Sequence, residues 1–171
     1  FSLLIAAFNR DRVFLLFGAW LLTSLRVAGQ NGGWDSAWLG LPLDVDTQRV
    51  ALRLSLVGYF VLSIGLFESL FRTELQRLRA RQQVWGLLGI VISAPPLAWW
   101  LLPAQSLAVV WGCGFLSITM IFVWITRIVV NQPSAVAYSS AVAWSIGAAG
   151  VIGEIAFASG WTIQWPAFLN S

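Results

Sequence analysis

The chain has 171 residues, of which 58% are hydrophobic and 10% are charged, and its formal net charge is +3. Its mean hydropathy is +0.79. Soluble domains are nearer half apolar and a quarter charged, so this composition excludes a soluble globular domain, a disordered chain, a coiled coil and a disulfide scaffold, and indicates a membrane protein.

The available residue types exclude most kinds of catalytic chemistry. Histidine is absent and the single cysteine, Cys113, lies inside an apolar run. These absences exclude histidine general bases, His or Cys metal clusters, CxxC redox pairs and intramolecular disulfides. There is also no Gly-rich phosphate loop, GxSxG or HExxH motif. We therefore expect no catalytic residues, no metal and no cofactor in this chain, and we expect that it is not an enzyme.

Apolar stretches between charged residues predict the membrane spans. Residues 1–8 (FSLLIAAF) are too short to span, and we interpret them as the tail of a truncated preceding helix. At about 20 apolar residues per span, the rest of the chain provides five complete spans. They cover residues 13–28, 50–71, 84–102, 107–130 and 135–159. The predicted fold is all-α, with residues 1–171 forming one polytopic transmembrane helix bundle.

Two of these spans come from one uncharged stretch, Gln82–Thr126, which is too long for a single helix. We divide it at Pro103 and the polar pair that follows. Pro95 and Pro96 lie inside the first half, where they either form a hinge or end the helix early. Residues 160–171 form a polar and aromatic linker, and together with the abrupt start they indicate a fragment of a longer protein.

Arginine placement predicts the orientation. All ten basic residues are arginines. One set of alternate loops and flanks holds seven of them: Arg10, Arg12, Arg72, Arg77, Arg79, Arg81 and Arg127. The opposite set holds three: Arg26, Arg49 and Arg53. Because cytoplasmic loops are enriched in basic residues, the first set is predicted to be cytoplasmic.

Four of these arginines form a cytoplasmic basic cluster, Arg72, Arg77, Arg79 and Arg81, within the segment Phe71–Gln83. The segment is typical of a helix extension that lies against anionic lipid headgroups. Nucleic-acid binding is the alternative, but the run is short, lacks lysine and is flanked by spans. We expect contact with the lipid bilayer and no nucleic-acid partner.

Tryptophans support the same orientation. Six lie at or beyond the predicted outer boundary: Trp34, Trp38, Trp99, Trp100, Trp161 and Trp165. An interfacial belt is the usual role of such residues, and an outer ligand-binding shelf is the alternative. Four deeper ones are predicted to pack between helices: Trp20, Trp111, Trp124 and Trp144.

The last span is rich in small residues, which allow close approach of helix backbones in lipid. The predicted packing residues are Ser145, Ala149, Gly150 and Gly153. Glu154 follows them and is the single charge in the last span. A carboxylate in hydrocarbon costs roughly 2.5–3.5 kcal/mol, so it requires protonation, water or a cationic partner, or it reaches the interface. We hypothesise that Glu154 and Arg53 form an outer-leaflet polar site that binds a ligand or couples the helices.

Three regions resemble the bacterial seven-transmembrane receptors with diverse intracellular signalling modules. In Phe8–Gly33, the turn Arg10-Asp11-Arg12 precedes an aromatic-rich helix and a Gly-bearing loop. In Leu56–Leu78, a helix runs into a basic segment. In Arg127–Gly160, a basic turn and a Pro-x-Ala-like step precede a helix with a Gly-ended tip.

The resemblance implies a sensory transmembrane module in the bacterial inner membrane, with a histidine kinase or diguanylate cyclase as a cytoplasmic output domain outside this chain. It also implies a homodimer formed through the full-length receptor, and an unidentified small-molecule or sensor-domain ligand. One alternative is a structural subunit of a membrane complex. The other is part of a transporter, which the intramembrane acid and the Pro-Pro pair favour.

Overall fold

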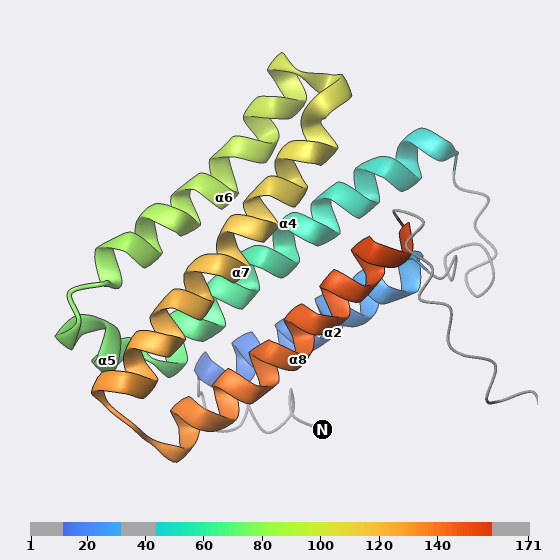
Figure 1. Ribbon diagram of the computed structural model, residues 1–171. Helices are drawn as coiled ribbons and strands as arrows, with labels where there is room; N and C mark the ends of the chain where they lie inside the picture. The colour runs from blue at the N-terminus through green and yellow to red at the C-terminus, as the bar shows by residue number, and fades with distance from the viewer. Residues whose placement is uncertain (1–11, 32–43, 159–171) are drawn as a thin grey trace, which may run out of the picture. The chain divides into compact units, whose positions relative to one another are not determined.

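Helices make up the regular structure in a computed structural model of the chain, which describes residues 12–31 and 44–158 (Figure 1). For residues 30, 31 and 150–158 it describes the backbone alone. The elements are α2 (Arg12–Asn31), α4 (Val45–Leu70), α5 (Arg72–Arg77), α6 (Arg81–Leu101), the 3₁₀ turn η1 (Pro103–Gln105), α7 (Ser106–Asn131) and α8 (Ala135–Ala158). No strand occurs in these ranges, and the predicted all-α helix bundle is confirmed.

Four segments of the described chain are long and apolar enough to cross a membrane: Arg12–Gly29, Val45–Leu70, Arg81–Leu101 and Pro103–Asn131. A shorter apolar stretch, Ala135–Ala149, lies in α8. Large apolar side chains also lie exposed along the helices, such as Phe115 at 73% and Trp100 at 81%. An apolar exterior of this kind is suited to lipid rather than water. The chain is a multi-pass α-helical membrane protein.

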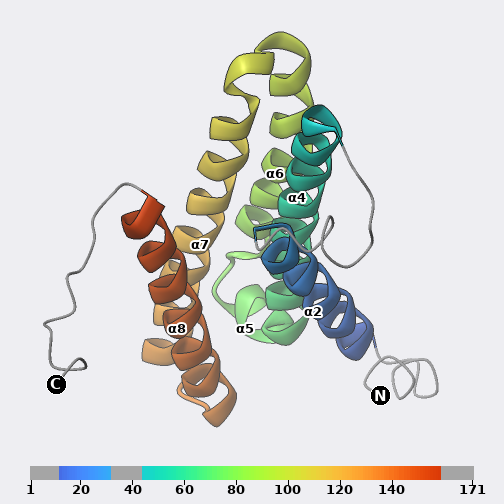
Figure 2. The ribbon, with the colours of Figure 1, turned by 90° about the vertical axis from the view of Figure 1, so that its right-hand side faces the viewer.

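The helices fall into two compact units, which meet in the sequence between Trp124 and Ile125. In the first unit α4 contacts both α2 and α6 (Figures 1 and 2). The pairing of α2 with α4 is antiparallel, because Trp20 contacts Ser63 whereas Thr23 lies opposite Gly58. The buried side chains of α4 are Leu56, Phe60, Ser63, Ile64, Leu66 and Phe67. α4 is therefore the central helix of this unit.

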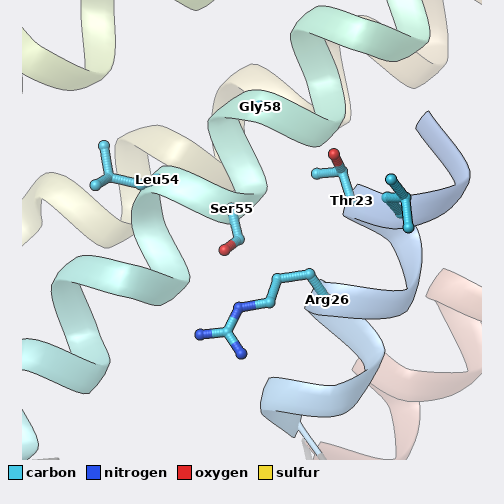
Figure 3. Close-up of a pocket in the computed structure, with 6 residues that line it drawn as sticks. Thr23, Arg26, Leu54, Ser55 and Gly58 are labelled. Carbon is cyan, nitrogen blue, oxygen red and sulfur yellow. The ribbon is translucent and has the colours of Figure 1, made fainter. Parts of the chain in front are cut away.

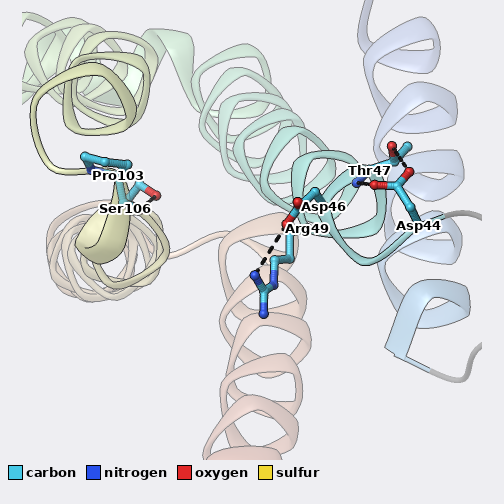
Figure 4. Close-up of polar contacts among 6 residues, drawn as sticks. All are labelled: Asp44, Asp46, Thr47, Arg49, Pro103 and Ser106. Atoms are coloured by element: carbon cyan, nitrogen blue, oxygen red, sulfur yellow. Dashed lines mark hydrogen bonds and ion pairs between the residues drawn. The ribbon is translucent and has the colours of Figure 1, made fainter.

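The start of α4 lies five residues before the predicted span boundary at residue 50. Asp44 is the N-cap, and its carboxylate accepts hydrogen bonds from the backbone N–H and the hydroxyl of Thr47 (Figure 4). This cap satisfies an N–H group that has no partner within the helix. The polar turn Asp46–Arg49 is thereby part of the helix rather than of the preceding loop.

α6 continues through Pro95 and Pro96 to Leu101. The alternative that the prolines end the helix early is therefore wrong. Pro95 has no N–H group for the carbonyl of Val91, four residues earlier, and Pro96 has none for Ile92. After Leu102, the η1 turn reverses the chain, and the Ser106 hydroxyl donates a hydrogen bond to the Pro103 carbonyl (2.7 Å; Figure 4).

The segment Phe71–Gln83 is not one helix extension, and this part of the prediction is wrong. α4 ends at Leu70, and the six-residue α5 follows Phe71. Arg79 then adopts a positive φ of 53°, and the Ala80 N–H donates to the Leu75 carbonyl. A left-handed residue reverses the chain after a short helix. Leu75 and Phe71 are buried and so anchor this turn within the first unit.

The second unit contains α8, which begins after Pro133. The Ser134 hydroxyl accepts a hydrogen bond from the Ala137 N–H (3.1 Å) and so caps the helix. Of the predicted packing residues, Ser145 and Ala149 are exposed. The side chains of Gly150, Gly153 and Glu154 lie outside the described residues, as do residues 1–8. The packing role of α8 stays a prediction.

Candidate functional site

An arginine stacks on a tryptophan at the end of the first unit that contains the α4 N-terminus. The guanidinium carbon of Arg53 on α4 lies 5.6 Å from the ring centroid of Trp99 on α6. A guanidinium over an indole face is attracted by the ring quadrupole, and the attraction grows when water is excluded. Trp99 thus contacts a neighbouring helix, and its predicted role as an interfacial anchor stays a prediction.

This contact compensates only part of the cost of burying the Arg53 guanidinium. The residue is half-buried, and within the described residues its Nε is buried without a hydrogen-bond partner. A buried donor that lacks an acceptor is costly, and such an atom in a native structure calls for an explanation. A carboxylate brought to this point would satisfy the donor and the charge together. The predicted partner Glu154 has no described side chain, so the pairing stays a hypothesis.

The opposite end of α4 carries an ion pair to the same neighbouring helix. Arg81 Nε donates to Glu68 Oε1 over 3.1 Å, and the two side chains are 34% and 17% exposed. Arg81 stands at the first position of α6, and Glu68 in the last turn of α4. The pair therefore closes the α4–α6 contact at the end where the basic cluster lies.

The basic cluster is divided by this pair. Arg72, Arg77 and Arg79 are exposed on α5 and the following turn. Arg81, in contrast, forms the ion pair with Glu68. Three of the four predicted residues can thus meet an anionic surface, whereas the fourth has a structural role in joining two helices.

Polar and aromatic contacts join α4 to α2 between its two ends. Trp20 Nε1 donates to Ser63 Oγ over 2.9 Å. The Trp20 ring also stacks on Tyr59, with centroids 6.0 Å apart. A hydrogen bond between two spanning helices satisfies an indole N–H that has no water partner in hydrocarbon. Trp20 packs between helices, as predicted.

A second aromatic group lies near the Glu68–Arg81 pair. Trp124 on α7 is 1% exposed and stacks on Phe67, with centroids 5.9 Å apart. Its Nε1 donates to Gln83 Oε1 over 3.3 Å. This tryptophan is therefore buried as predicted and links three helices. Trp111 is 42% exposed, and the prediction that it packs between helices is wrong for the described residues.

Sequence reasoning identified Arg53 but not its contact with Trp99, and it missed the Glu68–Arg81 pair. The sequence did contain a signal for each of the two pairs. Arg53 and Trp99 are predicted at the same depth in neighbouring spans, and so are Glu68 and Arg81. What was lacking is the rotation of each helix, which decides whether two side chains at one depth face each other.

In the described part of the chain, no three His, Cys, Asp or Glu side chains gather where they could hold a metal ion. The contacts instead fix one helix against its neighbours at both ends. Comparison with protein-family models, curated proteins and solved structures gives no match to this chain. The class defined by fold and composition is that of a multi-pass helical membrane protein.

Proposed function

We propose that the chain is the transmembrane sensory module of a bacterial receptor, which relays an extracytoplasmic signal to a cytoplasmic histidine kinase or diguanylate cyclase domain. The proposal places it in the inner membrane, as part of a receptor that dimerises through its full-length chain. The resemblance of Phe8–Gly33, Leu56–Leu78 and Arg127–Gly160 to the seven-transmembrane signalling receptors suggested this function. The attachment of both ends of α4 to α6 is the observation that supports it best.

α4 is one continuous helix between its two polar contacts. Arg53 and Glu68 are fifteen residues apart, which corresponds to about 22 Å of helical rise. An event that changes the Arg53–Trp99 contact would therefore bias the position of a rigid element that ends at the Glu68–Arg81 pair. Signal relay requires only that a ligand binds two helix arrangements with different affinity.

The orphaned Arg53 Nε suggests the chemistry of the signal. Among the described residues this atom has no acceptor, and the signal that we propose is therefore the arrival or departure of a carboxylate or similar anion. Glu154 is one candidate acceptor and an acidic ligand is the other. A transporter is less well supported, because α6 stays helical through Pro95 and Pro96, whereas transporter sites favour unwound helices.

The test measures output from the full reading frame in membrane vesicles, as autophosphorylation or cyclic diguanylate formation. Arg53→Gln should shift the basal output severalfold, and Glu68→Gln should do so as well. Arg49→Gln is the matched control, because Arg49 lies on the same helix with a side chain that is 65% exposed. A reading frame with no output domain, or wild-type output from both Arg53→Gln and Glu68→Gln, would refute the proposal.

The pairing of Arg53 with Glu154 is tested separately in the same assay. Glu154→Gln, Arg53→Gln and the double variant form a double-mutant cycle. If the two residues act together, the double variant resembles the single variants. Additive effects would assign the missing acceptor to a ligand instead.

A further inference from the structure

The turn between α5 and α6 has a hydrogen-bond pattern in which glycine is the usual residue. The Arg79 N–H donates to the Gln76 carbonyl over 3.1 Å, and the Ala80 N–H donates to the Leu75 carbonyl over 3.0 Å. These two bonds define a Schellman motif, whose left-handed residue is most often glycine. Here that residue is Arg79, with a φ of 53°. The chain thus holds an arginine where a residue without a Cβ would fit with less strain.

The backbone of this turn is anchored on both sides. Leu75 is 0% exposed and Ala80 is 2% exposed, and Arg81, the next residue, pairs with Glu68 of α4. The Arg79 side chain, in contrast, is exposed. Since glycine would serve the backbone better, the exposed guanidinium is the feature that an arginine adds at this position.

Two further arginines, Arg72 and Arg77, are exposed on α5. Among the described residues, none of the three guanidinium groups takes part in an ion pair. The one carboxylate within the α5 sequence is that of Glu74, which is half-buried. Residues 72–79 therefore carry an excess of positive charge that is open to the surroundings and complements an anionic partner.

Exposed apolar side chains indicate where this segment lies relative to a bilayer. Leu70 ends α4 and is 41% exposed, and Trp85 lies near the start of α6 and is 54% exposed. Both helices are able to cross a membrane. Trp85 follows Arg81, the first residue of α6, by about 6 Å of helical rise. Because tryptophan concentrates at the membrane–water interface, residues 72–79 are expected at the level of the lipid headgroups.

A guanidinium presents a planar set of donors that matches two oxygens of a phosphate. We propose that Arg72, Arg77 and Arg79 form a binding site for the headgroup of an anionic phospholipid, in which the left-handed backbone of Arg79 fixes the position from which its side chain reaches the lipid. The sequence pattern had suggested headgroup contact along a helix extension, whereas the structure assigns it to a fixed turn. This proposal is independent of the proposed signalling function, because it uses neither Arg53 nor an output domain.

The test titrates the purified full chain in neutral detergent with phosphatidylglycerol or phosphatidylcholine of identical acyl chains. Native mass spectrometry measures the dissociation constants, and phosphatidylglycerol should bind more tightly. Arg79→Gly should weaken its binding about fivefold, as expected for one basic residue near an anionic surface. Arg79→Lys should keep most of the affinity. Without added lipid, the midpoint temperature of unfolding of Arg79→Gly should equal or exceed that of the wild type, because glycine favours the left-handed conformation.

Two control variants separate this site from other places where a lipid could bind. Arg49→Gln removes an exposed cation near the start of α4, and should leave the dissociation constant unchanged. Gly58→Val alters a groove of about 400 Å³ between α2 and α4, which Thr23, Ser55 and Gly58 help to line (Figure 3). A Cβ at Gly58 meets Thr23 Cγ2 at an ordinary 3.8 Å, so the fold should be kept, and phosphatidylglycerol binding should be unchanged here as well.

Four outcomes of the binding experiment would overturn the proposal: equal affinities for the two lipids, equal effects of Arg79→Gly and Arg49→Gln, loss of binding in Gly58→Val, or displacement of the lipid by millimolar inorganic phosphate. A lower midpoint temperature of unfolding for Arg79→Gly would also overturn it, since the arginine would then serve the turn itself.

Discussion

Phe60 of α4 lies directly against Gly114 of α7, with no room for a side chain at the glycine. A Cβ built on Gly114 would overlap Phe60 Cζ. Phe60 is itself 4% exposed and so has little freedom to move away. In the described structure, Gly114 of α7 thus makes room for an aromatic ring from α4, at a position that the sequence had not singled out.

Gly114→Ala is expected to destabilise the protein by about 1–3 kcal/mol, because the added methyl group must displace a packed ring or separate the helices. Gly112→Ala is the matched control, since a Cβ at Gly112 meets nothing within 4 Å. Thermal unfolding in detergent checks both variants. Equal midpoints for Gly114→Ala and the wild type would contradict the contact.

The Glu68–Arg81 pair should contribute more to stability than the Asp46–Arg49 pair near the start of α4. The first joins two helices and is largely shielded, whereas the second lies within one helix with side chains 65% and 88% exposed. Double-mutant cycles with Gln and Asn replacements should give a coupling energy of about 1–2 kcal/mol for Glu68–Arg81. The value for the exposed pair should lie below about 0.5 kcal/mol. Coupling energies of the same size would show that shielding has no effect here.

The cap of α4 should depend on pH. The hydroxyl of Thr47 and then its backbone N–H hold the pKa of Asp44 below its usual value of 3.8. Because the folded pKa is the lower one, the stabilisation is fully present above 3.8 and is lost as the pH falls through the folded pKa. Between pH 5 and the acid limit of the experiment, the midpoint temperature of unfolding should therefore fall further for the wild type than for Asp44→Ala. Parallel midpoints over this range would show that the carboxylate does not cap the helix.

The orientation can be measured directly with single cysteines. Gln76 on α5 is predicted to be cytoplasmic and Gln105 in the η1 turn extracytoplasmic, and both are exposed. In a variant without Cys113, a cysteine at 105 should react with an impermeant maleimide in intact cells. A cysteine at 76 should react only after permeabilisation. The reverse pattern would invert the topology.

The sequence alone determined which segments are helical and able to span. Long apolar stretches and the scarcity of charge are local properties, and they placed the ends of α6, α7 and α8 within a few residues. The early start of α4 depended on the Asp44 cap, and the reversal after α5 on a left-handed Arg79. Both are single-residue conformations that an average over an apolar stretch does not detect.

Only the tertiary structure decided which side chains meet. Lipid-facing and packed faces are both apolar in a membrane protein, so the hydrophobic pattern carries little information about the rotation of each helix. Arg53 over Trp99, Glu68 with Arg81, and Phe60 on Gly114 each join two different helices. Each contact requires a particular rotation of α4 relative to α6 or α7, and that rotation is fixed by side-chain packing along the whole helix rather than by any local motif.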